Sequence, residues 1–82
     1  MKDAEIRARV VAILRGNAPE VEEGELRADK PLREQVDLDS MDWLNVILGV
    51  HADLGVDIPE ADYGKLRTLE DWTAYLRARL PA

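Results

Sequence analysis

The sequence predicts an all-α fold in one small domain that spans residues 1–82. Apolar residues recur at helical spacing in three stretches, within residues 3–16, 39–54 and 68–80, and such spacing indicates amphipathic helices. Capping residues and helix breakers bound each stretch. A chain of this length buries only about 60% of its unfolded surface, so few helices must supply the whole core.

The first helix is expected to be capped by Asp3 and to end at the breakers Gly16, Asn17, Ala18 and Pro19. Its apolar side chains fall on one helical stripe, and we expect this stripe to face the core: Ile6, Val10, Ile13 and Leu14.

The connection over residues 17–39 is longer than most loops without structure in compact domains. We therefore expect either a functional loop or one that holds a short turn of helix. Apolar residues are spaced through it as anchors into the core: Val21, Leu26, Leu32, Val36 and Leu38.

The helix over residues 39–54 has an apolar arc of about 220° at 100° per residue, wider than the roughly 100° stripe of an ordinary surface helix. One side of the arc holds Trp43, Val46, Ile47, Val50 and Leu54, and the other holds Met41, Leu44, Leu48 and His51. The polar remainder consists of Asp42, Asn45, Gly49 and Asp53. The excess apolar strip is either covered by residues 17–39 or exposed to partners.

A short helix is expected between Ile58 and Leu66, with Pro59 at its first position. In the last helix Thr68 and Asp71 match a capping box, and Pro81 ends the run. One face of this helix is apolar: Leu69, Trp72, Leu76 and Leu80.

The net charge of −6 is concentrated in residues 17–62, which hold 13 acidic and 3 basic side chains. This field repels phosphodiesters and attracts basic protein surfaces, which argues against nucleic acid as a partner. There is no cysteine, so disulfides, thiolate metal sites and cysteine nucleophiles are excluded. No run approaches the ~20 apolar residues of a membrane span, and the charged amino terminus does not fit a signal peptide, so we expect a cytoplasmic protein.

Ser40 is the candidate functional residue. Asp39 has an acidic residue three positions on and is the better helix cap, which leaves Ser40 at the first helical position with its hydroxyl free. A hydroxyl there lies beside unpaired N–H groups and the positive end of the helix dipole, which favours an attached phosphodiester.

Other chemistries at Ser40 are disfavoured. The one histidine, His51, follows eleven positions later in the same helix, about 16 Å away, too far to act as a base. Neither lysine stands in a Ser-x-x-Lys arrangement with Ser40. A calcium loop starting at Asp37 would need Gly and Glu where Asp42 and Leu48 stand. We expect no catalytic residue and no metal site.

Residues 36–42, Val-Asp-Leu-Asp-Ser-Met-Asp, lead into an apolar helical run and then into Gly-Val-Asp-Ile-Pro at residues 55–59. This order resembles the acyl carrier protein family, closely over the second half of the chain and in pattern over the first.

The resemblance implies that Ser40 receives 4′-phosphopantetheine from coenzyme A, with Asp39 recognised by the phosphopantetheinyl transferase. The arm would carry an acyl group as a thioester between separate enzymes of fatty acid, polyketide or specialised lipid biosynthesis, and the protein itself would catalyse nothing. The implied fold is a small four-helix bundle of three longer helices and one short, in a monomer.

The chain departs from fatty acid carriers where they place several glutamates after the serine. Here those positions hold Asn45, His51 and Ala52. We expect docking enzymes to contact these residues together with Met41, Asp42, Leu44 and Leu48, through apolar as well as basic surfaces. An aminoacyl or peptidyl carrier and a helical interaction module without covalent cargo are the alternatives, and intact mass after incubation with coenzyme A and a transferase separates the last of these from a carrier.

Overall fold

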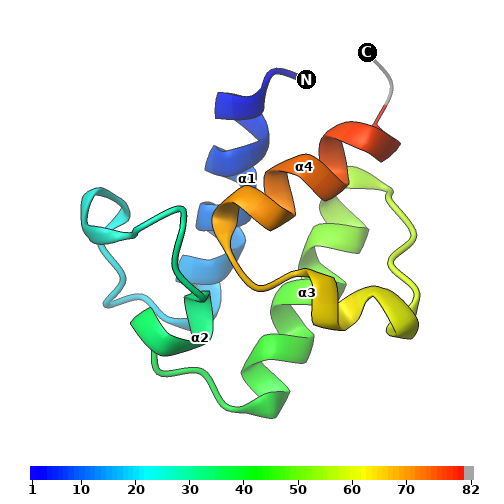
Figure 1. Cartoon of the computed structure of the whole chain (residues 1–82). Helices are drawn as coiled ribbons and strands as arrows, with labels where there is room; N and C mark the ends of the chain where they lie inside the picture. The colour runs from blue at the N-terminus through cyan, green and yellow to red at the C-terminus, as the bar shows by residue number, and fades with distance from the viewer. Residues whose placement is uncertain (81–82) are drawn as a thin grey trace.

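The computed structural model describes residues 1–80, and every regular element in that range is helical (Figure 1). The three long helices are α1 (Asp3–Asn17), α3 (Ser40–Leu54) and α4 (Leu69–Arg79). A short helix, α2 (Leu32–Gln35), and two 3₁₀ segments, η1 (Glu23–Glu25) and η2 (Glu60–Lys65), lie in the connections. The predicted all-α class is confirmed. None of the helices within residues 1–80 has both the length and the apolar character needed to cross a bilayer.

The core lies where α1 packs against both α3 and α4. On α3 the predicted core side is confirmed, because Val46, Ile47 and Val50 are buried. The connection between α1 and α3 also contributes as expected, since it contains η1 and α2 and all five of its anchors are buried: Val21, Leu26, Leu32, Val36 and Leu38.

Two of the polar residues of α3 face α1, which the helical pattern alone does not indicate. A Cβ atom built on Gly49 would lie 2.8 Å from Cγ2 of Ile13, so the glycine permits the two helices to approach closely. The guanidinium of Arg9 donates to both carboxylate oxygens of Asp53, at 3.2 and 3.0 Å. The side of α3 that carries these two residues is therefore an interface with α1.

The predicted cap of α1 is wrong. Asp3 is the first helical residue and Lys2 precedes it as the cap. The Asp3 carboxylate instead accepts a 2.6 Å hydrogen bond from the Arg77 guanidinium of α4, a tertiary contact that takes the side chain away from its own helix end. The carboxylate of Glu5 accepts from the N–H of Lys2 at 3.4 Å.

The capping box of α4 is confirmed. The hydroxyl of Thr68 accepts the N–H of Asp71 at 3.0 Å, and the Asp71 carboxylate accepts the N–H of Thr68 at 3.1 Å. The helix ends at Arg79, so Leu80 is its carboxyl-terminal cap and not a helical residue. The predicted stop at Pro81 lies outside the described residues.

The short helix between Ile58 and Leu66 is present as η2, but it is a 3₁₀ helix and Pro59 precedes its first residue. Asp62 fastens η2 to α4. The Tyr75 hydroxyl donates a 2.6 Å hydrogen bond to Asp62 Oδ2, and Lys65 Nζ lies 3.1 Å from Oδ1. These contacts, the Tyr75 hydrogen bond first, hold the pKa of Asp62 below its usual value.

Candidate functional site

Ser40 is the first residue of α3, and it is exposed. Asp39 precedes it with extended backbone, and its Oδ1 accepts the N–H of Asp42 at 2.8 Å while its carbonyl accepts the N–H of Trp43 at 3.0 Å. The predicted cap is therefore confirmed: Asp39 caps the helix, and the Ser40 hydroxyl takes no part in capping.

The surroundings of Ser40 suit a phosphodiester on its hydroxyl. Within residues 1–80, the N–H groups of Ser40 and Met41 make no hydrogen bond to the protein, and they stand at the positive end of a 15-residue helix. A phosphate on the hydroxyl would meet those donors at low desolvation cost, because the site is open to water. The residues present fit the attachment of 4′-phosphopantetheine.

The apolar strip predicted on α3 is exposed. Met41, Leu44 and Leu48 retain 67%, 36% and 50% of their accessible surface. The alternative of complete burial under residues 17–39 is wrong, because that connection directs its own apolar residues into the core. Together with Met1 these are the large hydrophobic side chains that the described chain leaves exposed.

The other residues predicted to contact partners surround this strip. Asn45, His51 and Ala52 are exposed, and Asp42 is half-buried. The Nδ1 atom of His51 lies 2.8 Å from the carbonyl oxygen of Val56, so this nitrogen carries the hydrogen and donates it. His51 therefore helps to close the carboxyl end of α3.

Gly55 is the carboxyl-terminal cap of α3. It has a positive φ of 68°, and its N–H donates to the His51 carbonyl at 2.9 Å. The left-handed conformation favours glycine at this position.

Two hollows flank the core side of α3. The first, which we call the arginine pocket, has a volume of about 260 Å³ and is lined by Pro31, Arg33, Trp43, Tyr63, Gly64, Leu66 and Arg67. The second, which we call the aspartate groove, has a volume of about 320 Å³ and is lined by Ile47, Leu48, His51, Asp57, Ile58, Pro59 and Tyr63. Tyr63 of η2 lies between them, so η2 is a wall of both.

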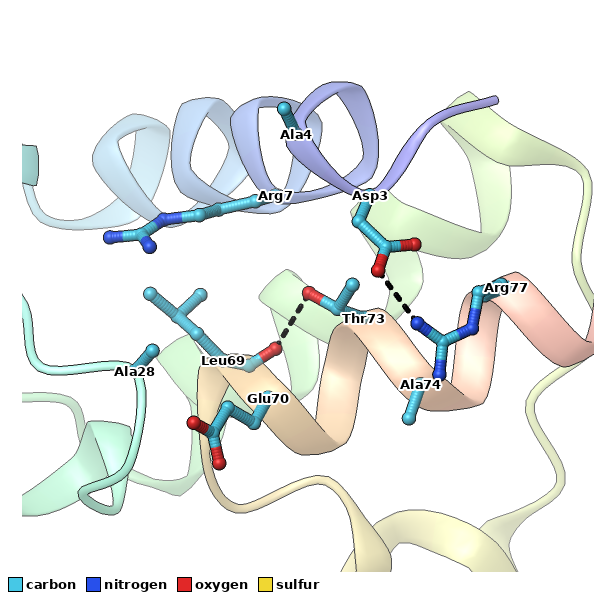
Figure 2. A pocket seen from close by; sticks show the side chains of 9 residues that line it. All are labelled: Asp3, Ala4, Arg7, Ala28, Leu69, Glu70, Thr73, Ala74 and Arg77. Carbon is cyan, nitrogen blue, oxygen red and sulfur yellow. Dashed lines mark hydrogen bonds and ion pairs between the residues drawn. The ribbon is translucent and has the colours of Figure 1, made fainter.

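A larger hollow than these two, about 530 Å³, lies elsewhere, between α1 and α4 (Figure 2). Its charged side chains balance: Arg77 pairs with Asp3, and Arg7 and Glu70 come from opposite walls. The Thr73 hydroxyl is already bonded to the carbonyl of Leu69 at 2.8 Å. None of the residues predicted to form the site lines this groove.

Sequence reasoning missed the two arginines of the arginine pocket. Arg33 and Arg67 are far apart in the sequence, and neither belongs to a recognisable motif. The N–H of Leu32 donates to the carbonyl of Arg67 at 2.8 Å, a backbone contact that brings α2 beside the residues before α4. Only this tertiary contact reveals the pair.

Comparison with known proteins assigns the family. Residues 8–76 match the family model described as "Phosphopantetheine attachment site". Over 57 residues the chain is 30% identical to a protein named acyl carrier protein from Rhodococcus erythropolis, and the aligned stretch covers 70% of this chain and 63% of that protein. The match thus spans less than two thirds of the relative's length. The chain belongs to the acyl carrier protein family, whose prosthetic group is covalently bound 4′-phosphopantetheine.

Proposed function

We propose that this protein carries an acyl group as a thioester on a 4′-phosphopantetheine arm attached to Ser40, and that it presents the group to separate enzymes of fatty acid, polyketide or specialised lipid biosynthesis. The observation that supports Ser40 best is its exposed hydroxyl at the first position of α3, with capping left to Asp39. Ser40 is also the only serine of the chain.

When attached, the arm supplies a thiol that binds the acyl group as a thioester. The protein's own residues hold the arm and expose it to partner enzymes. In this proposal a phosphopantetheinyl transferase recognises Asp39 and the start of α3, and supplies the metal and the base for attachment. The carrier acts as a cytoplasmic monomer of one domain and contributes no catalytic residue.

Docking enzymes are proposed to contact the apolar strip of Met41, Leu44 and Leu48. Asn45, Ala52 and His51 would border the contact, and Asp42 would add charge. The pairing of Asp53 with Arg9 supports the emphasis on apolar contact, because a carboxylate already bonded at 3.0 Å has less attraction left for a basic partner.

Intact mass tests the attachment. The wild-type protein, incubated with coenzyme A and a broad-specificity transferase, should gain one phosphopantetheinyl group. Ser40→Ala should gain none and should keep its helical circular dichroism. Thr73→Ala is the matched control, because its hydroxyl bonds within α4, and it should be modified like the wild type.

Modification of Ser40→Ala would place the arm elsewhere. A wild-type protein that never gains the group, while another carrier in the same reaction does, would leave a helical interaction module without cargo as the better reading.

A further inference from the structure

The arginine pocket differs in chemistry from the aspartate groove beside it. We propose that the arginine pocket holds the free end of the cargo. The cargo is then a short acyl group with the thioester at one end and a carboxylate at the other. The inference rests on the proposed function, because the cargo reaches the pocket from the arm on Ser40. It specifies the chemistry of the cargo, which the family leaves open.

The pocket begins close to the attachment point. Trp43, which lines it, is three residues after Ser40 in α3, a rise of about 4.5 Å along the helix. Residues three apart are neighbours on a helix surface. An arm that folds back from Ser40 along α3 therefore passes the Trp43 side of the helix first.

The size of the pocket favours a short cargo. Trp43 packs edge-to-face on Trp72, with ring centroids 6.0 Å apart and an interplanar angle of 74°, and Trp72 is fully buried. The two indoles therefore fill the core behind the pocket. A cavity of about 150 Å³ accommodates benzene, so about 260 Å³ holds a few carbons and a polar end. A long alkyl chain would have to displace Trp43.

The charge of the pocket favours a carboxylate. Arg33 and Arg67 both line it, and within residues 1–80 neither guanidinium forms a salt bridge. The nearby carboxylate of Asp71 accepts backbone N–H groups at the start of α4 and so serves the capping box. Guanidinium groups bind carboxylates through two parallel hydrogen bonds.

The aspartate groove offers the opposite environment. Its lining is mostly apolar, and its carboxylate, Asp57, lies 3.7 Å from His51. A cargo ending in a methyl group would suit that groove, whereas a cargo ending in a carboxylate would be repelled from it. The contrast between the two hollows makes the inference testable with two cargoes of equal size.

The test compares a glutaryl cargo with glutaramyl, its neutral amide isostere. A transferase supplied with either acyl-coenzyme A loads the full-length protein, and intact mass confirms loading. Two readouts follow: the indole N–H resonances of the two tryptophans, and the rate at which hydroxylamine cleaves the thioester, normalised to the free acyl-pantetheine.

In the glutaryl form the indole N–H resonance of Trp43 should be shifted from its position in the glutaramyl form. The glutaryl thioester should be cleaved about two- to fivefold more slowly than that of the glutaramyl form, the size expected for an ion pair with the exposed Arg33 and Arg67. Arg33→Gln and Arg67→Gln should each reduce this ratio, and the double variant should bring it to about one. Arg15→Gln, which removes the same charge at the end of α1, should leave the ratio unchanged. Thermal melts check that each variant is folded.

Equal protection of both cargoes, or a ratio that survives in the double variant, would overturn the inference while leaving the carrier role intact. Failure of the wild-type protein to load at all would overturn both, and the mass spectrum distinguishes the two failures.

Discussion

Gly49→Ala tests the close approach of α1 to α3. Gly49 lies in the interior of α3, and a Cβ atom there would be 2.8 Å from Cγ2 of Ile13. Real Cβ atoms essentially never come so close to another heavy atom, so either the Ile13 side chain or one of the two helices must shift. The methyl of Ile13 cannot easily turn away, because a β-branched side chain has one strongly preferred χ1 rotamer in a helix.

Two opposing effects set the magnitude. Alanine in place of glycine in a helix interior favours folding by about 1 kcal/mol. Overpacking a tight contact costs about 1–3 kcal/mol. The difference predicts a net loss of between about 0 and 2 kcal/mol. For a domain of this size each kcal/mol corresponds to a melting-temperature change of about 4–8 °C.

Thermal and urea unfolding followed by circular dichroism measure the effect. Gly16→Ala is the control, since it also replaces a helical glycine but its Cβ meets nothing within 4 Å, and it should stabilise by up to about 1 kcal/mol. In an Ile13→Ala background Gly49→Ala should likewise become stabilising, because the opposing methyl is gone. A gain from Gly49→Ala in the otherwise wild-type chain as large as that from Gly16→Ala would refute the close approach.

Three further predictions follow from other contacts. Leu48→Ala should lower turnover by docking enzymes at both low and high salt and should reduce the free energy of unfolding by less than about 1 kcal/mol. Ile47→Ala, which truncates the buried residue next to it, should reduce the free energy of unfolding by about 2–5 kcal/mol, measured in urea. Folding keeps the pKa of Asp62 low, so the stability that this carboxylate contributes is fully present above the unfolded pKa of about 4 and is lost as pH falls through the lower folded pKa. Asp62→Asn should therefore flatten the acid side of a plot of melting temperature against pH. Adding salt at neutral pH should raise the melting temperature by screening the repulsion among the acidic residues of 17–62, and a temperature independent of salt would contradict this.

Much of the site could be predicted because its determinants are local. The cap joins Asp39 to a residue three positions away, and Ser40 is free for that reason. The exposed strip was visible as an arc too wide for one helix to bury. Whether the strip is covered or exposed, however, depended on where residues 17–39 run, and local patterns do not specify that path.

The capping prediction for Asp3 failed for a related reason. A carboxylate beside a helix start is a good local cap, but the same group lies within reach of Arg77 in the folded chain. Local propensity and a tertiary ion pair competed for one side chain, and the contact with α4 prevailed. The modification of Ser40 and the docking residues stay predictions until they are measured.

By itself the sequence determined the three long helical segments, the cap that leaves Ser40 exposed and the apolar strip beside it, because all of these depend on residues within one or two turns of each other. Tertiary structure decided whether that strip is exposed, and it also set pairings between distant residues: Gly49 lies against Ile13, Arg9 binds Asp53 across 44 residues, and Arg33 and Arg67 line one pocket. The members of each pair come from different segments of the chain, and the periodicity within a helix tells which face is apolar but not which residue of another segment will face it.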